Sequence, residues 1–253
     1  MISIVPGPRE CARIRGRERS ADGFPETPRW GTIQRVRTQF TLELVALSND
    51  LTLMSRLAHD ATERVTEALA SADLTATYEV FALDEQLQQM FAACENRTMA
   101  LLALQAPVAR DLRHVVTAIQ IAGELSRIGR RTETAGQYVY RAHPRAVAPE
   151  PVLAELVAMG TLAAECVAGV SASVATGRFV ADDGTAGEAM ETRCARLRTV
   201  LTTTDADAGT GAAIDLALLG SQFQRCVDHT ARIARLIRFL DTGIPPESGT
   251  LPD

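Results

Sequence analysis

Two stretches of sequence mark corresponding places in the halves of this chain: Ser126-Arg127-Ile128-Gly129-Arg130 and Gln224-Arg225-Cys226-Val227-Asp228. Positions four apart on a helix lie one above the other on the same face. Two carboxylates at that spacing, supplied by two such segments, would form an oxygen-rich pocket for a metal ion. Of the four positions concerned, only Asp228 is acidic. The pattern therefore predicts the scaffold of a metal-binding helical protein that has lost most of its metal ligands.

An internal duplication extends outward from these stretches. Glu43-Leu44-Val45-Ala46-Leu47 corresponds to Glu155-Leu156-Val157-Ala158-Met159, 112 positions later. Arg127 corresponds to Arg225, 98 positions later. The offset shrinks because the second half has shorter turns. Two tandem three-helix bundles, six helices in all, are the natural all-α architecture for such a repeat.

Helical periodicity runs through almost all of the chain from Phe40 onward. Asp73 is expected to cap the second helix, and Pro107 to open the third at a position where proline is tolerated. Short loops predict antiparallel neighbours. The expected helices cover residues 40–70, 74–103, 107–142, 150–176, 185–203 and 211–241.

Composition agrees with helices and sets limits on function. Hydrophobic residues make up 46% of the 253 residues, and aromatic residues only 4%. Such sequences suit closely packed helices better than β-sandwiches. The formal net charge of −5 argues against a nucleic-acid binder, which usually has a basic face. The five cysteines are scattered without a C-x-x-C pair, which is typical of reduced, intracellular thiols.

Membrane and secretion signals are missing from the sequence pattern. No run of 18 apolar residues predicts a transmembrane helix, and the N-terminus lacks the apolar stretch of a secretory signal. We therefore expect a cytoplasmic protein.

The first 35 residues differ from the rest. They hold seven arginines against four acidic residues, and glycines and prolines from Gly23 to Gly31 interrupt any helix. We expect residues 1–35 to be a disordered or mis-annotated N-terminal extension upstream of a true start at Val36. The expected domains are then a first bundle at 36–142, a linker at 143–149, a second bundle at 150–241 and a flexible tail at 242–253.

Pro107-Val108-Ala109-Arg110-Asp111-Leu112-Arg113, followed by Glu124-Leu125-Ser126-Arg127-Ile128-Gly129, resembles the PhoU family of phosphate-signalling regulators. In that family a P-V-A-x-D-L-R segment precedes an E-R-I-G-D segment, and an E-R-x-x-D-H segment closes the other half. The resemblance covers roughly residues 36–241. Its motif positions here are Asp111, Arg113, Glu124, Ser126, Arg127, Arg130, Gln224, Arg225 and Asp228.

The resemblance implies a cytoplasmic, often dimeric protein of two three-helix bundles without catalytic activity. It implies an adaptor that couples a phosphate ABC transporter, through its ATPase, to a membrane sensor histidine kinase. Such an adaptor keeps phosphate-starvation genes off when phosphate is plentiful, and it meets the membrane only through its partner proteins. Several family members bind iron or zinc clusters or manganese through the acidic motifs.

This chain departs from the family at the acidic positions. Ser126 and Gln224 replace glutamates, and both are poor ligands for a divalent or trivalent ion. Arg130 replaces an aspartate and places a permanent positive charge where a cation would lie. We therefore expect no cofactor, and Asp228 with its neighbour His229 is the weak candidate for any metal that does bind.

Several alternatives stay open. Asp228 and His229 could share a metal with Glu133 or Glu124, although adjacent helix residues point about 100° apart; they could equally be solvated or ion-paired. Asp111 and His114 have the i, i+3 spacing of a di-iron ligand pair, but no second pair accompanies them. Asp111 would otherwise complement the helix dipole in a first turn.

Arg127, Arg130 and Arg131 form a basic cluster in an acidic protein. They could bind an anion such as phosphate, or an acidic partner helix, through bidentate guanidinium groups. The alternative is ion pairing with Glu124, Glu133 and acids of the other bundle. No Ser/His/Asp order or Gly-rich phosphate loop indicates an enzyme.

The sequence thus predicts a non-enzymatic, PhoU-like regulator of phosphate homeostasis. The alternative is a metal-binding helical bundle that stores or uses iron or manganese, and a third option is a purely structural dimerisation module.

Overall fold

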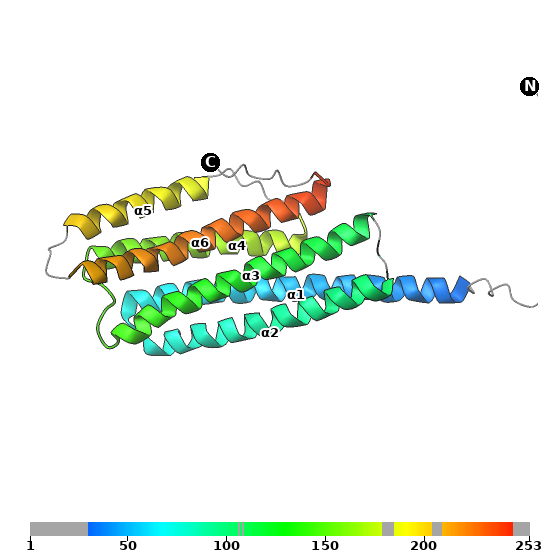
Figure 1. The fold of residues 1–253 in the computed structure, drawn as a ribbon, viewed down its shortest axis with the longest axis horizontal. Helices are drawn as coiled ribbons and strands as arrows, with labels where there is room; N and C mark the ends of the chain where they lie inside the picture. Colours follow the sequence, from blue (N-terminus) through cyan, green and yellow to red (C-terminus); the bar gives the residue numbers. More distant parts are fainter. Residues whose placement is uncertain (1–29, 106, 108, 179–184, 204–208, 245–253) are drawn as a thin grey trace, which may run out of the picture. The chain divides into compact units, whose positions relative to one another are not determined.

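The computed structural model describes residues 30–105, 107, 109–178, 185–203 and 209–244. Within these ranges the chain forms six α-helices and no strand (Figure 1). The helices are α1 (Trp30–Ser71), α2 (Leu74–Gln105), α3 (Ala109–Ala142), α4 (Val152–Thr176), α5 (Thr185–Thr203) and α6 (Gly209–Thr242). The predicted all-α class of two three-helix bundles is confirmed.

Local signals place the helix ends close to where the sequence predicts them. The Asp73 carboxylate accepts a hydrogen bond from the Thr75 backbone N–H at 2.7 Å, so Asp73 caps α2 as expected. Ala72, with φ of 52°, turns the chain between α1 and α2. Gly177 ends α4 in the left-handed conformation (φ 63°) that glycine adopts without strain.

The N-terminal and C-terminal expectations fall largely outside the described residues. α1 begins at Trp30, within the stretch predicted to be an extension. Residues 1–29 and the end of the predicted tail, 245–253, lie outside the description. The predicted domain boundaries therefore stay predictions.

In the first bundle, α2 contacts both α1 and α3. The Arg97 guanidinium on α2 lies 3.0 Å from Glu43 and 3.5 Å from Asp50, both on α1. The buried Cys94 and Met54 sulfur atoms meet at 4.0 Å across the same pair of helices. α2 and α3 also contact each other along their lengths.

In the second bundle, α4, α5 and α6 contact one another pairwise. Among the described helices, α4 alone is long and apolar enough to cross a membrane, with a mean hydropathy of 1.6 over its most apolar window. Most of its buried residues belong to the protein core, because they contribute to the apolar cluster shared with the other helices. They are Val152, Leu153, Leu156, Met159, Gly160, Ala163, Ala164, Val167, Val170 and Ser173.

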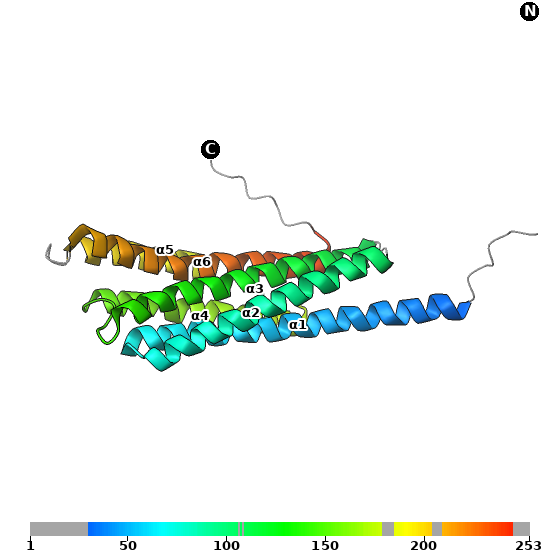
Figure 2. The ribbon, with the colours of Figure 1, turned by 60° about the horizontal axis from the view of Figure 1, so that its bottom comes forward.

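The two bundles meet along two helix pairs. α3 and α6 lie side by side and run in opposite directions (Figures 1 and 2). α1 meets α4 where Ser55 and Ser171 hydroxyls lie 3.0 Å apart. Gly160 on α4 lies so close to α1 that a Cβ there would come within 2.5 Å of the Thr66 hydroxyl. The buried apolar side chains of both bundles form one continuous core.

Candidate functional site

The first motif segment lies on the face of α3 that packs against α2. Ser126 and Arg130, four apart on α3, meet Asp84 and Gln88, four apart on α2. The Arg130 guanidinium donates to Asp84 Oδ2 at 3.0 Å. The Ser126 hydroxyl donates to Gln88 Oε1 at 2.7 Å, and Gln88 Nε2 donates to Asp84 Oδ1 at 2.7 Å. We call these four residues the α2–α3 network.

Gly129 makes this close packing of α2 and α3 feasible. A Cβ on Gly129 would lie 2.8 Å from Leu87 Cδ1 and 3.0 Å from Asp84 Oδ1. Both neighbours are buried, so neither has space to retreat. The absence of a side chain at position 129 therefore sets the distance at which Arg130 reaches Asp84.

The second motif segment faces its own bundle too. Half-buried Gln224 lines a pocket of about 450 Å³, together with Glu191, Cys194 and Arg198 of α5. Asp228 and Arg225 are exposed, and Cys226 is buried. Ser126 and Arg130 therefore contact α2, whereas Gln224 lies beside α5, so these motif positions do not form one shared pocket.

Glu124 and His229 join the two bundles. His229 Nδ1 on α6 lies 2.6 Å from Glu124 Oε2 on α3, and the two residues are only 6% and 8% exposed. A carboxylate can only accept, so Nδ1 carries the proton and donates it. Arg127 donates to the other oxygen of Glu124, and Arg232 lies 3.8 Å from Oε2. We call Glu124 and His229 the interbundle pair.

The neighbours of Glu124 determine the pKa of its carboxyl group. Burial alone raises the pKa of the Glu124 carboxyl, because burial penalises its charged form. The hydrogen bond and charge of His229, with smaller contributions from Arg127 and Arg232, outweigh burial and hold the pKa below its usual 4.5. Glu124 is therefore an ionised carboxylate at neutral pH.

A second contact between α3 and α6 mirrors the interbundle pair. Arg131 Nη1 lies 3.4 Å from Gln222 Oε1. Glu124 precedes Gln222 by 98 positions, and Arg131 precedes His229 by the same 98 positions. The contact of Glu124 with His229 is therefore repeated by their equivalents, Gln222 and Arg131, as in the isologous interface of a two-fold dimer. The 98-residue offset found in the sequence therefore has a structural counterpart at this junction.

The residues that the sequence offered as metal ligands do not come together in the structure, apart from Glu124 and His229. His229 does meet Glu124, whereas Asp228 is turned outward and Glu133 accepts a hydrogen bond from Gln137. Asp111 is exposed in the first turn of α3, where its charge complements the helix dipole.

Two further residues near the start of α3 have local roles. Burial, with smaller contributions from neighbouring charges, lowers the pKa of the His114 imidazole below its usual value. Arg113 places its guanidinium 5.6 Å from the centre of the Phe239 ring, a cation–π contact with the end of α6. This motif arginine therefore helps to dock α6 onto α3.

The three arginines of the predicted basic cluster contact three different partners. Arg127 pairs with Glu124, Arg130 with Asp84, and Arg131 with Gln222. Only Arg127 meets an acid that the ion-pairing alternative named, because Asp84 belongs to the same bundle as Arg130 and Gln222 is a neutral amide.

The α2–α3 network does not suit the metal cluster that family resemblance implies. Its single carboxylate, Asp84, is 3% exposed and already accepts from Arg130 and Gln88. Hard cations need several oxygen donors with negative charge, and a fixed guanidinium repels them. The sequence missed Asp84 and Gln88, although their i, i+4 spacing matches that of Ser126 and Arg130.

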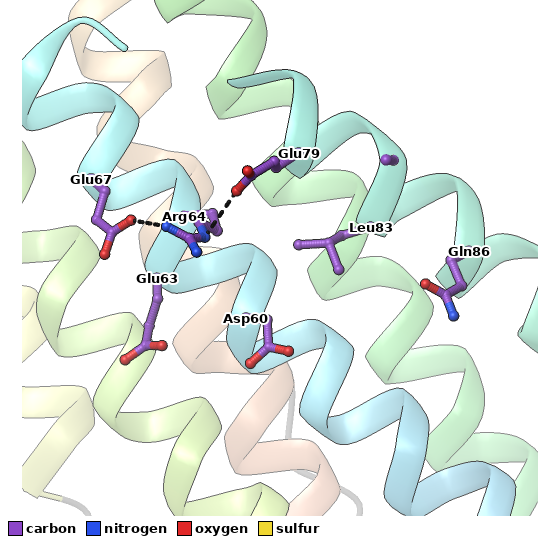
Figure 3. Close-up of a pocket in the computed structure, with 8 residues that line it drawn as sticks. Asp60, Glu63, Arg64, Glu67, Glu79, Leu83 and Gln86 are labelled. Carbon is purple, nitrogen blue, oxygen red and sulfur yellow. Dashed lines mark hydrogen bonds and ion pairs between the residues drawn. The ribbon is translucent and has the colours of Figure 1, made fainter. Parts of the chain in front are cut away.

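A separate groove of about 690 Å³ lies between α1 and α2, away from both motif segments (Figure 3). Arg64 crosses it, 2.7 Å from Glu67 and 3.0 Å from Glu79. Beside it, His59 lies 3.6 Å from each of the exposed carboxylates of Asp60 and Glu63, an arrangement that ion pairing explains. In the sequence, the signal for this groove was the helical spacing of acidic residues on α1.

Comparison with known proteins adds independent findings. The model of the PhoU domain family matches residues 51–139. The chain is 35% identical, over 219 residues, to the phosphate-specific transport system accessory protein PhoU homolog 1 of Mycobacterium leprae, covering 86% of this chain and 99% of the relative. It is 34% identical over 213 residues to PhoU homolog 2 of Mycobacterium tuberculosis, covering 83% and 100% of the two chains.

Solved structures share the fold. The phosphate transport system regulatory protein PhoU from Streptococcus pneumoniae superposes with a TM-score of 0.67 at 22% identity, covering 81% of this chain and 98% of that protein. PhoU from Pseudomonas aeruginosa has a TM-score of 0.62 at 20% identity, covering 81% and 100%. With a third of its residues identical to curated relatives over nearly their whole length, the chain belongs to the PhoU family.

Proposed function

We propose that this protein is an accessory regulator of phosphate transport that acts in the cytoplasm without catalysis. It couples a phosphate ABC transporter ATPase to a sensor histidine kinase and represses phosphate-starvation signalling when phosphate is plentiful. It works by protein–protein binding, as a homodimer, and it meets the membrane through these partners.

The observation that carries this proposal is similarity over whole chains. Relatives named as phosphate-specific transport system accessory proteins align over 99% and 100% of their lengths at 35% and 34% identity. An accessory role suits a helical bundle in which buried polar residues join helices, as the α2–α3 network and the interbundle pair do.

The proposed mechanism is a shift in the conformational equilibrium of the partner. A regulator that binds one state of a kinase or transporter more tightly than the other shifts the partner toward that state. Its effect is limited by the difference between the two affinities, so tight binding alone does not suffice. Helix faces positioned by a rigid shared core suit such selective binding.

Deletion of the gene, combined with affinity capture, tests the proposal. Deletion should switch phosphate-starvation genes on in phosphate-rich medium, and the tagged protein should capture a transporter ATPase and a histidine kinase. A variant with a broken core, Phe223→Asp, is the matched control and should capture neither, since Phe223 is fully buried. Unchanged starvation genes after deletion, or capture of neither partner by the native protein, would contradict the proposal.

A further inference from the structure

We propose that the Arg130 guanidinium takes the place of a metal ion in the first bundle, so that this half of the protein is held together without metal. The inference concerns the α2–α3 network and does not depend on the regulatory partners.

The geometry brings two i, i+4 pairs into contact, as in a site built from two helices. Asp84 and Gln88 project from α2, and Ser126 and Arg130 project from α3. A metal ion in such a site bridges side chains of both helices and neutralises their carboxylates. Here Arg130 bridges the helices at 3.0 Å and neutralises Asp84.

The hydrogen bonds of the network close on themselves. Asp84 accepts from Arg130 on one oxygen and from Gln88 on the other. Gln88 accepts from the Ser126 hydroxyl at 2.7 Å and donates to the Ser126 carbonyl at 3.1 Å. The polar groups at the centre of the network are therefore satisfied by one another, with no carboxylate left over for an ion.

Charge leads to the same conclusion. The network holds one carboxylate and one guanidinium, so its net charge is zero, whereas a divalent site needs a surplus of negative oxygen donors. Arginine stays protonated throughout the physiological pH range. The guanidinium therefore neutralises the buried Asp84 regardless of metal supply.

The test uses purified full-length protein with Mn²⁺ as the probe. After dialysis against Mn²⁺ and then buffer, the native protein should retain no stoichiometric metal by elemental analysis. Its Tm should be the same in EDTA and in Mn²⁺. The variant Ser126→Glu/Arg130→Asp supplies two new carboxylates beside Asp84, and its Tm should rise by roughly 5–10 °C at Mn²⁺ about 100-fold above Kd.

Two controls isolate the site. Arg238→Asp/Thr242→Glu makes the same charge change at exposed i, i+4 positions of α6 and should show no rise in Tm with Mn²⁺. Arg130→Met removes only the cation and should lower the metal-free Tm by roughly 3–6 °C, which remains measurable if the double variant does not fold.

Three results would overturn the proposal. One is stoichiometric metal retained by the native protein, with a fall in Tm when EDTA removes it. Another is a folded Ser126→Glu/Arg130→Asp variant whose Tm does not respond to Mn²⁺. The third is an Arg130→Met protein as stable as the native one.

Discussion

Replacing His229 by leucine removes the partner of a buried carboxylate at the junction of the two bundles. Glu124 Oε2 loses a donor at 2.6 Å, and the leucine side chain fills most of the space that the imidazole occupied. Because Glu124 is only 8% exposed, water cannot fully replace that donor. The variant therefore tests whether the interbundle pair holds α3 against α6.

The expected loss of stability depends on which charged partners the Glu124 carboxylate keeps. A hydrogen bond to a charged group contributes about 1.5–3 kcal/mol, and a buried charge stripped of its partner costs about 3–5 kcal/mol. Arg127 and Arg232 still face the carboxylate after the change, which lowers the cost. We expect His229→Leu to reduce the free energy of unfolding by about 2–3 kcal/mol.

A double-mutant cycle separates this interaction from simple loss of packing. Glu124→Leu alone leaves the buried imidazole without an acceptor, and we expect it to cost about 1–3 kcal/mol. The double variant replaces both partners by apolar groups, so its cost should fall below the sum by about 2 kcal/mol. Urea unfolding at pH 7, followed by circular dichroism, measures all four proteins.

The exposed pair Arg64–Glu67 on α1 provides the matched control cycle. Its two side chains are 49% and 60% exposed, and such pairs contribute at most about 0.5 kcal/mol. If the Glu124–His229 coupling energy is no larger than that of the control, the interbundle pair does not hold the bundles together and the reasoning fails.

Three further predictions concern single positions. Gly129→Ala should lower the free energy of unfolding, measured by thermal unfolding, by about 1–3 kcal/mol, because the added Cβ meets buried neighbours on α2. The control Gly169→Ala has nothing within 4 Å of the added Cβ, so it should leave the free energy of unfolding unchanged or raise it by up to about 1 kcal/mol. Burial raises the pKa of the thiols of Cys94 to about 11 and Cys226 to about 12, so both should resist alkylation at pH 8 until urea unfolds the protein; fast labelling of either in the native state would contradict their burial. Because the folded protein lowers the pKa of Glu124, the stabilisation by its carboxylate is fully present above the unfolded pKa and is lost as pH falls through the folded pKa. The Tm difference between the native protein and Glu124→Gln should therefore be largest at pH 6–7 and shrink toward pH 3. A Tm difference that does not change with pH would refute this prediction.

Much of the secondary structure was predictable because its causes are local. Apolar residues at helical spacing set the helices, and Asp73 caps α2 through its own neighbours in the chain. The repeated segments around Arg127 and Arg225 were visible for the same reason: a duplication is a property of the sequence itself.

The candidate site was only partly predictable. The sequence offered Glu124 and Glu133 as alternative neighbours of His229, and the structure selects Glu124, 105 residues away. It did not show which residues the first motif would face, and in the structure Ser126 and Arg130 face Asp84 and Gln88 of α2.

The sequence by itself determined the helical class, the duplication, the family likeness and the loss of acidic residues at Ser126, Arg130 and Gln224. Only the tertiary structure decided which polar residues meet, namely Arg130 with Asp84 and Glu124 with His229. The physical reason is that periodicity shows which face of a helix is buried but not which helix covers it. That choice depends on close packing across the whole core, including the approach of α3 to α2 at Gly129.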